Sequence, residues 1–172
     1  YAAGAAASSS GIAVGGHQNT YGGNSDLILA KFNGLGSLLW CTYYGDTSEE
    51  SSTDVTVDAQ SNVYLIGQTT SPTNIASGGH QNQPGGRIDT FLAKFHASGN
   101  RLWATYYGDT MFDHPRAVFT DAASNVYLAG YTTSTRFIAS GGYQNTLLSM
   151  WGDAFIAKFD PAGTRLWGTY FG

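Results

Sequence analysis

The chain has 172 residues, of which 42% are hydrophobic and only 12% charged, with 23 glycines and a formal net charge of -4. This charge and the lack of a basic stripe give no reason to expect nucleic-acid binding through phosphate contacts. No apolar run reaches the ~20 residues of a membrane helix. Abundant glycine, aromatic, Thr and Ser residues predict short strands joined by turns, and argue against long solvated helices.

The chain is built from a repeat of 63 or 64 residues, which is the spacing between Trp40, Trp103 and Trp167. The region around each Trp has two apolar, aromatic-rich runs separated by a glycine-containing turn, the pattern of a β-hairpin. The three copies of this hairpin are Asp26–Gly45, Asp89–Gly108 and Asp153–Gly172. Repetition at this scale predicts a repeat architecture before any other signal is considered.

One full period contains four runs with strand composition, joined in two pairs by short turns. The runs are Arg116–Asp121, Val126–Thr132, Ala154–Phe159 and Arg165–Phe171. Four antiparallel strands per repeat is the size of one β-propeller blade. Both faces of the third run carry apolar residues, as in Phe91, Ala93 and Phe95 on one face and Leu92 on the other. We therefore expect each sheet to be covered on both sides by neighbouring sheets.

The predicted fold is an all-β propeller with about three four-stranded blades and 11 strands. Residues 1–46 form a partial blade that lacks its first strand, residues 47–109 a second blade, and residues 110–172 a third. Three blades cannot close a ring of the ~4 to 8 blades expected for this architecture. We therefore expect either further blades of a longer parent chain or self-association to complete the ring, because open blades leave unpaired edges and an exposed apolar face.

Three motifs in fixed order resemble the bacterial β-propeller repeat family called SBBP. They are D-x-F-x-A-K-F, G-x-x-L-W-x-T-Y-x-G, and V-D-A-x-S-N-V-Y-L-x-G at Val57–Gly67. The resemblance covers nearly the whole chain. It implies that Arg116–Asp121 is the innermost strand of its blade and Arg165–Phe171 the outermost, and it implies an extracellular or cell-surface location.

A Gly-Gly-His-Gln-Asn segment recurs in the long loop after the second strand of each blade, with Tyr in place of His in the third copy. One interpretation is a glycan site in each blade, because Gln and Asn pair donors with acceptors as sugar hydroxyls require. The other is that Gly-Gly makes a tight turn while Gln and Asn bond local backbone groups. The predicted ligand residues are His17, Gln18, Asn19, His80, Gln81, Asn82, Tyr143, Gln144 and Asn145.

Two acidic segments, Gly45–Asp54 and Gly108–Pro115, precede the first strands of the second and third blades. Clustered carboxylates suit Ca²⁺ or acid–base chemistry, but neither segment has the spacing of a calcium loop. His114 lies next to Asp113 without a recognisable nucleophile motif, and we expect it to be a solvated loop residue. We therefore predict no metal site, no cofactor and no catalytic residue.

The remaining recurrent residues are expected to be structural. We expect the recurrent lysines to pair with aspartates such as Asp58 or Asp121, and the recurrent tryptophans to pack between blades. Cys41 is the only cysteine, which excludes an intrachain disulfide, and it is expected to fill a small strand position. An apolar insertion without counterpart in the other copies is the predicted partner contact, and its residues are Leu147, Met150 and Trp151.

The leading hypothesis is a non-enzymatic extracellular β-propeller module with a structural, adhesive or partner-binding role. The alternatives are a lectin-like propeller that binds one glycan per blade, and a hydrolase or lyase on a propeller scaffold. The expected partners are further copies or blades of the same kind and a glycan or protein ligand. Nucleic acid and membrane insertion are not expected.

Overall fold

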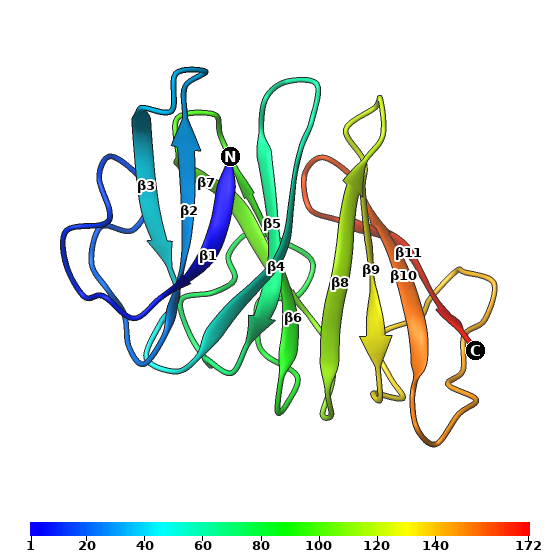
Figure 1. Ribbon diagram of the computed structural model, residues 1–172. Helices are drawn as coiled ribbons and strands as arrows, with labels where there is room; N and C mark the ends of the chain where they lie inside the picture. Colours follow the sequence, from blue (N-terminus) through cyan, green and yellow to red (C-terminus); the bar gives the residue numbers. More distant parts are fainter.

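The computed structural model describes residues 1–172 and contains three antiparallel sheets that stand side by side (Figure 1). It has eleven strands and no helix, and accordingly no helix that is long and apolar enough to cross a membrane. The prediction of an all-β fold built of propeller blades is confirmed. We call the three sheets blades 1, 2 and 3 in chain order.

Each blade is a meander, so strands that are consecutive in the chain are neighbours in the sheet. Blade 1 has three strands, which are β1 (Ala2–Ala6), β2 (Asp26–Phe32) and β3 (Leu38–Tyr44). Blade 2 has four, which are β4 (Glu50–Val57), β5 (Val63–Thr69), β6 (Asp89–Phe95) and β7 (Arg101–Tyr107). Blade 3 has β8 (Asp113–Thr120), β9 (Val126–Thr132), β10 (Asp153–Phe159) and β11 (Arg165–Phe171).

The first strands of blades 2 and 3 begin earlier than the composition suggested. Residues 50–54 and 113–115, expected to be loop, belong to β4 and β8. Pro115 is accommodated because the register shifts between Pro115 and Ala117, a bulge at which a residue without an amide hydrogen is tolerated. β8 lies against β4, where the Val118 amide donates to the Asp54 carboxylate at 3.0 Å.

The outer hairpin of every blade contains the same bulge. In β6–β7, Lys94 pairs with Trp103 and Phe95 with Arg101, so Leu102 is the extra residue. The equivalent extra residues are Leu39 and Leu166. The bulge turns these leucines outward, and all three stay exposed. They are part of the rim of the molecule and not of its core.

The core lies between the blades. One cluster joins blades 1 and 2 through residues such as Trp40, Tyr44 and Phe95, and the other joins blades 2 and 3 through residues such as Trp103 and Phe159. Both faces of β6 are buried, as its two-sided apolar pattern predicts. The prediction that the tryptophans pack between blades is confirmed for Trp40 and Trp103. Cys41 is buried, as expected for a small strand residue.

The recurrent lysines pair as expected wherever the blade supplies the aspartate. Lys94 Nζ lies 3.8 Å from Asp58 Oδ2, and Lys158 Nζ lies 3.6 Å from Asp121 Oδ2. Asp58 also accepts hydrogen bonds from Asn62 and from the Tyr64 hydroxyl. Burial alone would raise the pKa of Asp58, but these hydrogen bonds and Lys94 outweigh it, so the pKa is lowered.

Candidate functional site

Two cavities lie at equivalent places between successive blades. Both are at the end of the blades where the long loops lie. The cavity between blades 1 and 2 has a volume of about 470 Å³ and is lined by polar residues that include His17, Gln18 and Asn19. The cavity between blades 2 and 3 has a volume of about 430 Å³ and is lined by residues that include His80 and Gln81. The structure thus places two of the three predicted ligand segments at blade joints.

The glutamines of the three segments hold the loops in place. The Gln18 side-chain amide donates to the Thr20 carbonyl and to Asp26 Oδ2, each at 3.0 Å, and its oxygen accepts from the Gly45 amide at 3.3 Å. Gln81 likewise donates to a carbonyl of its own loop and accepts from the Gly108 amide. Gln144 likewise donates to a carbonyl of its own loop and to Asp153. Their donors and acceptors are therefore largely used within the chain.

The asparagines cap their own turns. Asn19 Nδ2 donates to the Gly16 carbonyl at 3.3 Å, and Asn82 and Asn145 make the same bond to the residue three positions before them. The interpretation that Gln and Asn bond local backbone groups is confirmed. That these residues also bind a ligand stays a prediction.

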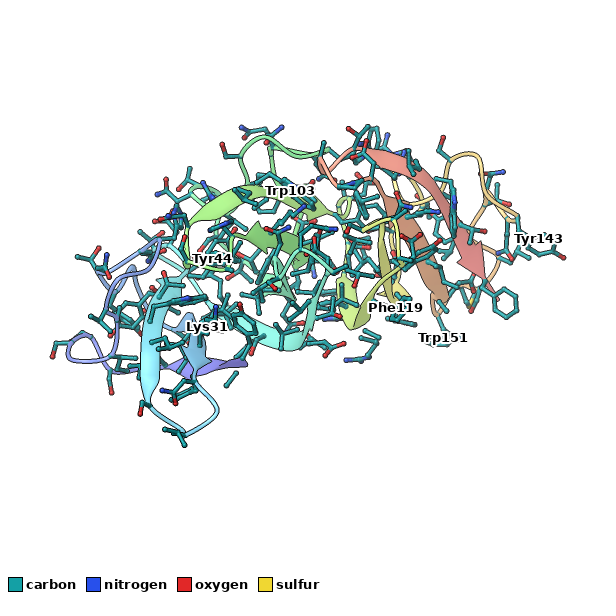
Figure 2. All side chains as sticks on the ribbon, turned by 90° about the horizontal axis from the view of Figure 1, so that it is seen from above. Lys31, Tyr44, Trp103, Phe119, Tyr143 and Trp151 are labelled. Atoms are coloured by element: carbon teal, nitrogen blue, oxygen red, sulfur yellow. The ribbon has the colours of Figure 1, made fainter.

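The aromatic residue of each segment reaches toward the next blade. The centroids of the His17 and Phe95 rings lie 6.4 Å apart, and those of His80 and Phe159 are separated by the same distance. Burial, helped by Arg101, lowers the pKa of His17 below its ordinary value. Tyr143 has no following blade to contact and is 88% exposed at the end of the molecule (Figure 2).

The imidazoles of the repeated segments lie apart from one another. His17 and His80 line different cavities, and the chain contains no group of three or more His, Cys, Asp or Glu side chains placed to hold a metal ion. The acidic segments differ from the loops that we predicted, because Glu50, Asp54 and Asp113 lie in strands β4 and β8. Glu50 and Asp113 accept hydrogen bonds from backbone amides and from side-chain hydroxyls.

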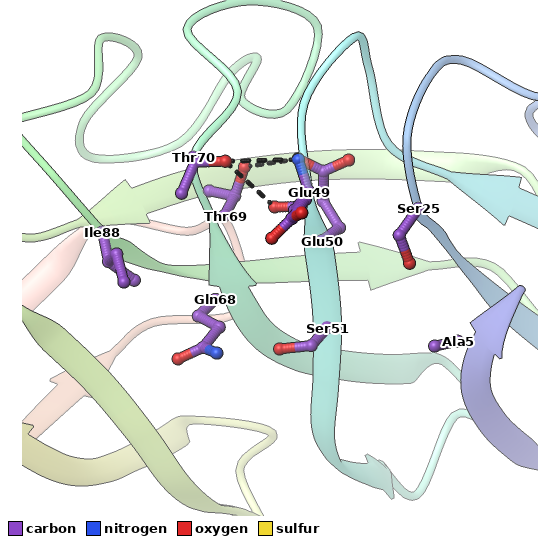
Figure 3. A pocket seen from close by; sticks show the side chains of 9 residues that line it. All are labelled: Ala5, Ser25, Glu49, Glu50, Ser51, Gln68, Thr69, Thr70 and Ile88. Carbon is purple, nitrogen blue, oxygen red and sulfur yellow. Dashed lines mark hydrogen bonds between the residues drawn. The ribbon is translucent and has the colours of Figure 1, made fainter. Parts of the chain in front are cut away.

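Glu50 and Asp113 are the anchored carboxylates at the starts of β4 and β8. Glu50 accepts from the Thr69 hydroxyl at 2.7 Å and from the Asp46 amide at 3.1 Å, beside a third cavity of about 380 Å³ (Figure 3). Asp113 accepts from the Asp109 amide at 3.0 Å and from Ser134 at 2.8 Å. Burial raises the pKa of both carboxyl groups.

A buried aspartate at the start of the third strand is a feature that sequence reasoning missed. Asp89 Oδ2 accepts from the Gly85 and Gly86 amides at 2.8 and 3.3 Å, whereas Oδ1 is buried without a hydrogen-bond partner. Burial raises the pKa of Asp89 to about 6, and the neighbouring Asp113 contributes in the same direction. The recurrence of Asp at positions 26, 89 and 153 was the available signal.

His114 is not the solvated loop residue that we expected. It lies in β8, partly buried, with Nδ1 2.7 Å from Gln68 Oε1 of blade 2. Its ring stacks on Phe112 with centroids 6.1 Å apart. Burial and Arg116 lower its pKa. These contacts give His114 a role in joining blades 2 and 3.

The apolar insertion of blade 3 lies in the loop between β9 and β10 and projects from the molecule (Figure 2). Met150 is 86% and Trp151 79% exposed. Leu147 differs from the prediction, because it packs against the core between blades 2 and 3. Leu148 is the exposed leucine of this loop. We call Leu148, Met150 and Trp151 the apolar loop.

Comparison with known proteins gives a limited result. No family model matches the chain. The chain is similar to the uncharacterized WD repeat-containing protein L264 of Acanthamoeba polyphaga mimivirus, with 26% identity over 175 residues. The similar region covers 83% of this chain but only 12% of that relative.

Proposed function

We propose that the chain is a non-enzymatic β-propeller module that binds a protein partner through the apolar loop. Its SBBP-type repeat motifs and an extracellular or cell-surface location are part of this proposal. The WD repeat name of the mimivirus relative supports it, because WD repeats build propellers.

The observation that carries the proposal is the contrast between the repeated residues and the apolar loop. The recurrent Gln and Asn side chains bond backbone groups of their own loops, and the Lys and Trp side chains of blades 1 and 2 bond turn carbonyls of the next blade, so all of these have a structural role. Met150 and Trp151, by contrast, are exposed, lie side by side in the chain, and have no counterpart in blades 1 and 2. Exposed Trp and Met are the residue types that anchor protein interfaces.

The experiment is a selection of random displayed peptides on the immobilised chain, followed by affinity measurement on variants. We expect the Met150→Ser, Trp151→Ser double variant to bind the selected peptides at least about 10-fold more weakly, as is typical for loss of a central Trp contact. The control is Leu35→Ser, because Leu35 is 92% exposed on a turn of blade 1. Equal binding to the double variant and the wild type would refute the assignment.

A second candidate function is glycan binding in the cavity between blades 2 and 3. Phe137 lines this cavity and is largely exposed, although its φ of 63° is unusual for a bulky residue. Asp109, on the same cavity, has a buried Oδ2 without a hydrogen-bond partner, 3.5 Å from Arg136 Nε. An aromatic ring next to a carboxylate offers a sugar both an apolar face and an acceptor.

Phe137→Asn tests this second function on a glycan array. Asn74 occupies the equivalent position with a φ of 61°, so the substitution keeps the backbone conformation that the loop requires. We expect glycan binding to be lost while the fold is retained. Absence of any binding at millimolar sugar by the wild-type chain would remove this function.

A further inference from the structure

The two cavities between blades share their layout but differ in charge. An aspartate lines each of them, Asp46 between blades 1 and 2 and Asp109 between blades 2 and 3. Arg101 also lines the first cavity, whereas Asp109 is the only Asp, Glu, Lys or Arg that lines the second. Burial, helped by Arg165, lowers the pKa of His80, which disfavours a positive charge on this ring. The cavity between blades 2 and 3 therefore has a negative lining.

The two aspartates are also satisfied differently. The Thr73 hydroxyl donates a hydrogen bond to the Asp46 carboxylate. Arg136 is the equivalent of Thr73 in the next blade, and its Nε lies 3.5 Å from Asp109 Oδ2. This carboxylate oxygen is buried without a hydrogen-bond partner. Because a buried acceptor without a donor is costly, Asp109 has room for a strong donor that the chain does not supply.

Phe137 is a residue that stability does not explain. Its φ of 63° lies in the left-handed region, which is strained for a bulky residue. The equivalent Asn74 has a φ of 61° and belongs to a residue type that tolerates this conformation. The Phe137 ring is 67% exposed, so burial does not offset the strain. Strain of this kind is typical of positions that contact a ligand.

The chain itself places a cation beside this carboxylate and this ring. Arg136 Cζ lies 5.8 Å from the centroid of the Phe137 ring, while Arg136 Nε is the atom next to Asp109 Oδ2. An aromatic face and a carboxylate both attract a positive charge. The Arg136 side chain is 68% exposed and makes no hydrogen bond to Asp109, so this guanidinium is held loosely. A ligand cation can take its place.

We propose that the glycan accepted by the cavity between blades 2 and 3 carries a protonated amine, as glucosamine units do, and that its ammonium replaces Arg136 beside Asp109. This inference rests on the glycan function proposed above for the same cavity. One pyranose ring supplies both contacts, because its C–H face stacks on Phe137 while its ammonium donates to Asp109 Oδ2. The cavity volume of about 430 Å³ lies in the range of small-ligand sites.

The cavity between blades 1 and 2 serves as an internal control. Its carboxylate is already bonded to Thr73, and Asn74 replaces the aromatic ring. Neither an unpaired acceptor nor an aromatic face is therefore offered there, although the cavity is of similar size, about 470 Å³. We accordingly expect one amino-sugar site in the chain and not two.

Isothermal titration calorimetry with two trisaccharides tests the proposal, at a pH where the amine is protonated. We expect one glucosamine trisaccharide to bind per chain. The N-acetylglucosamine trisaccharide has the same rings with neutral amides, and we expect it to bind at least about 10-fold more weakly because the charge-assisted hydrogen bond is lost. Equal affinities would overturn the proposal and leave the glycan function in place. Binding of neither sugar at millimolar concentration would remove both.

An arginine tripeptide tests whether the cation belongs to a protein instead. Its guanidinium groups match the chemistry of Arg136, but they lack the pyranose C–H face that stacks on Phe137. We expect the tripeptide to bind more weakly than the glucosamine trisaccharide. Tighter binding of the tripeptide would assign the cavity to a protein ligand and overturn the proposal.

Variants of Arg136 show whether this side chain is displaced by the ligand or contributes to its binding. Arg136→Ala removes the competing guanidinium, so we expect about 2- to 5-fold tighter binding of the glucosamine trisaccharide, the change expected for loss of a largely exposed ion pair. Arg136→Thr restores the hydroxyl that Thr73 gives to Asp46, and should bind more weakly than Arg136→Ala. The control is Arg87→Ala, which removes the same charge from an exposed arginine over Phe112, outside the cavity, and should leave the affinity unchanged. Unchanged or weaker binding by Arg136→Ala would overturn the proposal.

Discussion

The turn glycines offer a matched set of substitutions, because the same backbone occurs with and without a tryptophan against it. Gly163→Ala introduces a methyl group 2.8 to 3.0 Å from the indole ring atoms of Trp103, at a φ of 88°. Gly36→Ala introduces the same group at a φ of 80° into open space. The difference between the two variants isolates the contact between turn and tryptophan.

Both variants incur the cost of a left-handed conformation for alanine, about 1 to 2 kcal/mol. Gly163→Ala additionally overpacks the joint, which costs about 1 to 3 kcal/mol. We therefore expect Gly163→Ala to lower the free energy of unfolding by about 2 kcal/mol more than Gly36→Ala does. With a urea m-value of about 2 kcal/mol/M, this corresponds to midpoints that differ by about 1 M.

The assay is urea unfolding followed by tryptophan fluorescence. Gly99→Ala should behave like Gly163→Ala, because its Cβ would lie 2.9 to 3.2 Å from the Trp40 indole. Equal midpoints for Gly36→Ala and Gly163→Ala would refute the view that each turn rests on the tryptophan of the preceding blade.

Two further substitutions test the buried charges. The folded pKa of Asp89, about 6, exceeds the ordinary value of an aspartate, about 3.9, so the folded chain binds more protons than the unfolded chain and stability falls as pH rises from about 4 to 6. Asp89→Asn should reduce this slope, part of which Glu50 and Asp113 retain, and should raise the free energy of unfolding at pH 7 by up to about 3 kcal/mol. An unchanged difference between the urea midpoints at pH 4.5 and 7.5 would contradict this. Lys94→Met should lower the free energy of unfolding by about 3 kcal/mol, because it leaves Asp58 buried without its cation. Lys158→Met should lower it by less than about 1 kcal/mol, because the Lys158 side chain is 20% exposed. Similar losses of thermal stability in the two variants would count against the role of Lys94 in joining blades 2 and 3.

The blade architecture was predictable because it depends on local patterns that occur three times. The hairpin runs around Trp40, Trp103 and Trp167 and the turn glycines between them determine strand and turn in each copy. The starts of β4 and β8 were not predictable, because Ser, Asp and Pro are turn formers in isolation. Cross-strand pairing with β5 and β9 overrides that local preference.

The candidate site was predictable only in part. The Gly-Gly-His-Gln-Asn segments could be located from their repetition, but a repeated polar segment is equally compatible with a ligand site and with loop structure. Which side chain bonds which backbone group is a long-range property, as in the hydrogen bond that the Gly45 amide donates to the Gln18 side-chain oxygen.

Hydrogen exchange of the tryptophan indole N–H groups, observed by NMR, tests the joint most directly. Trp40 and Trp103 donate to turn carbonyls of the next blade, whereas Trp151 is exposed in the apolar loop. We predict slow exchange for Trp40 and Trp103 and fast exchange for Trp151. Fast exchange of Trp40 and Trp103 would contradict the account.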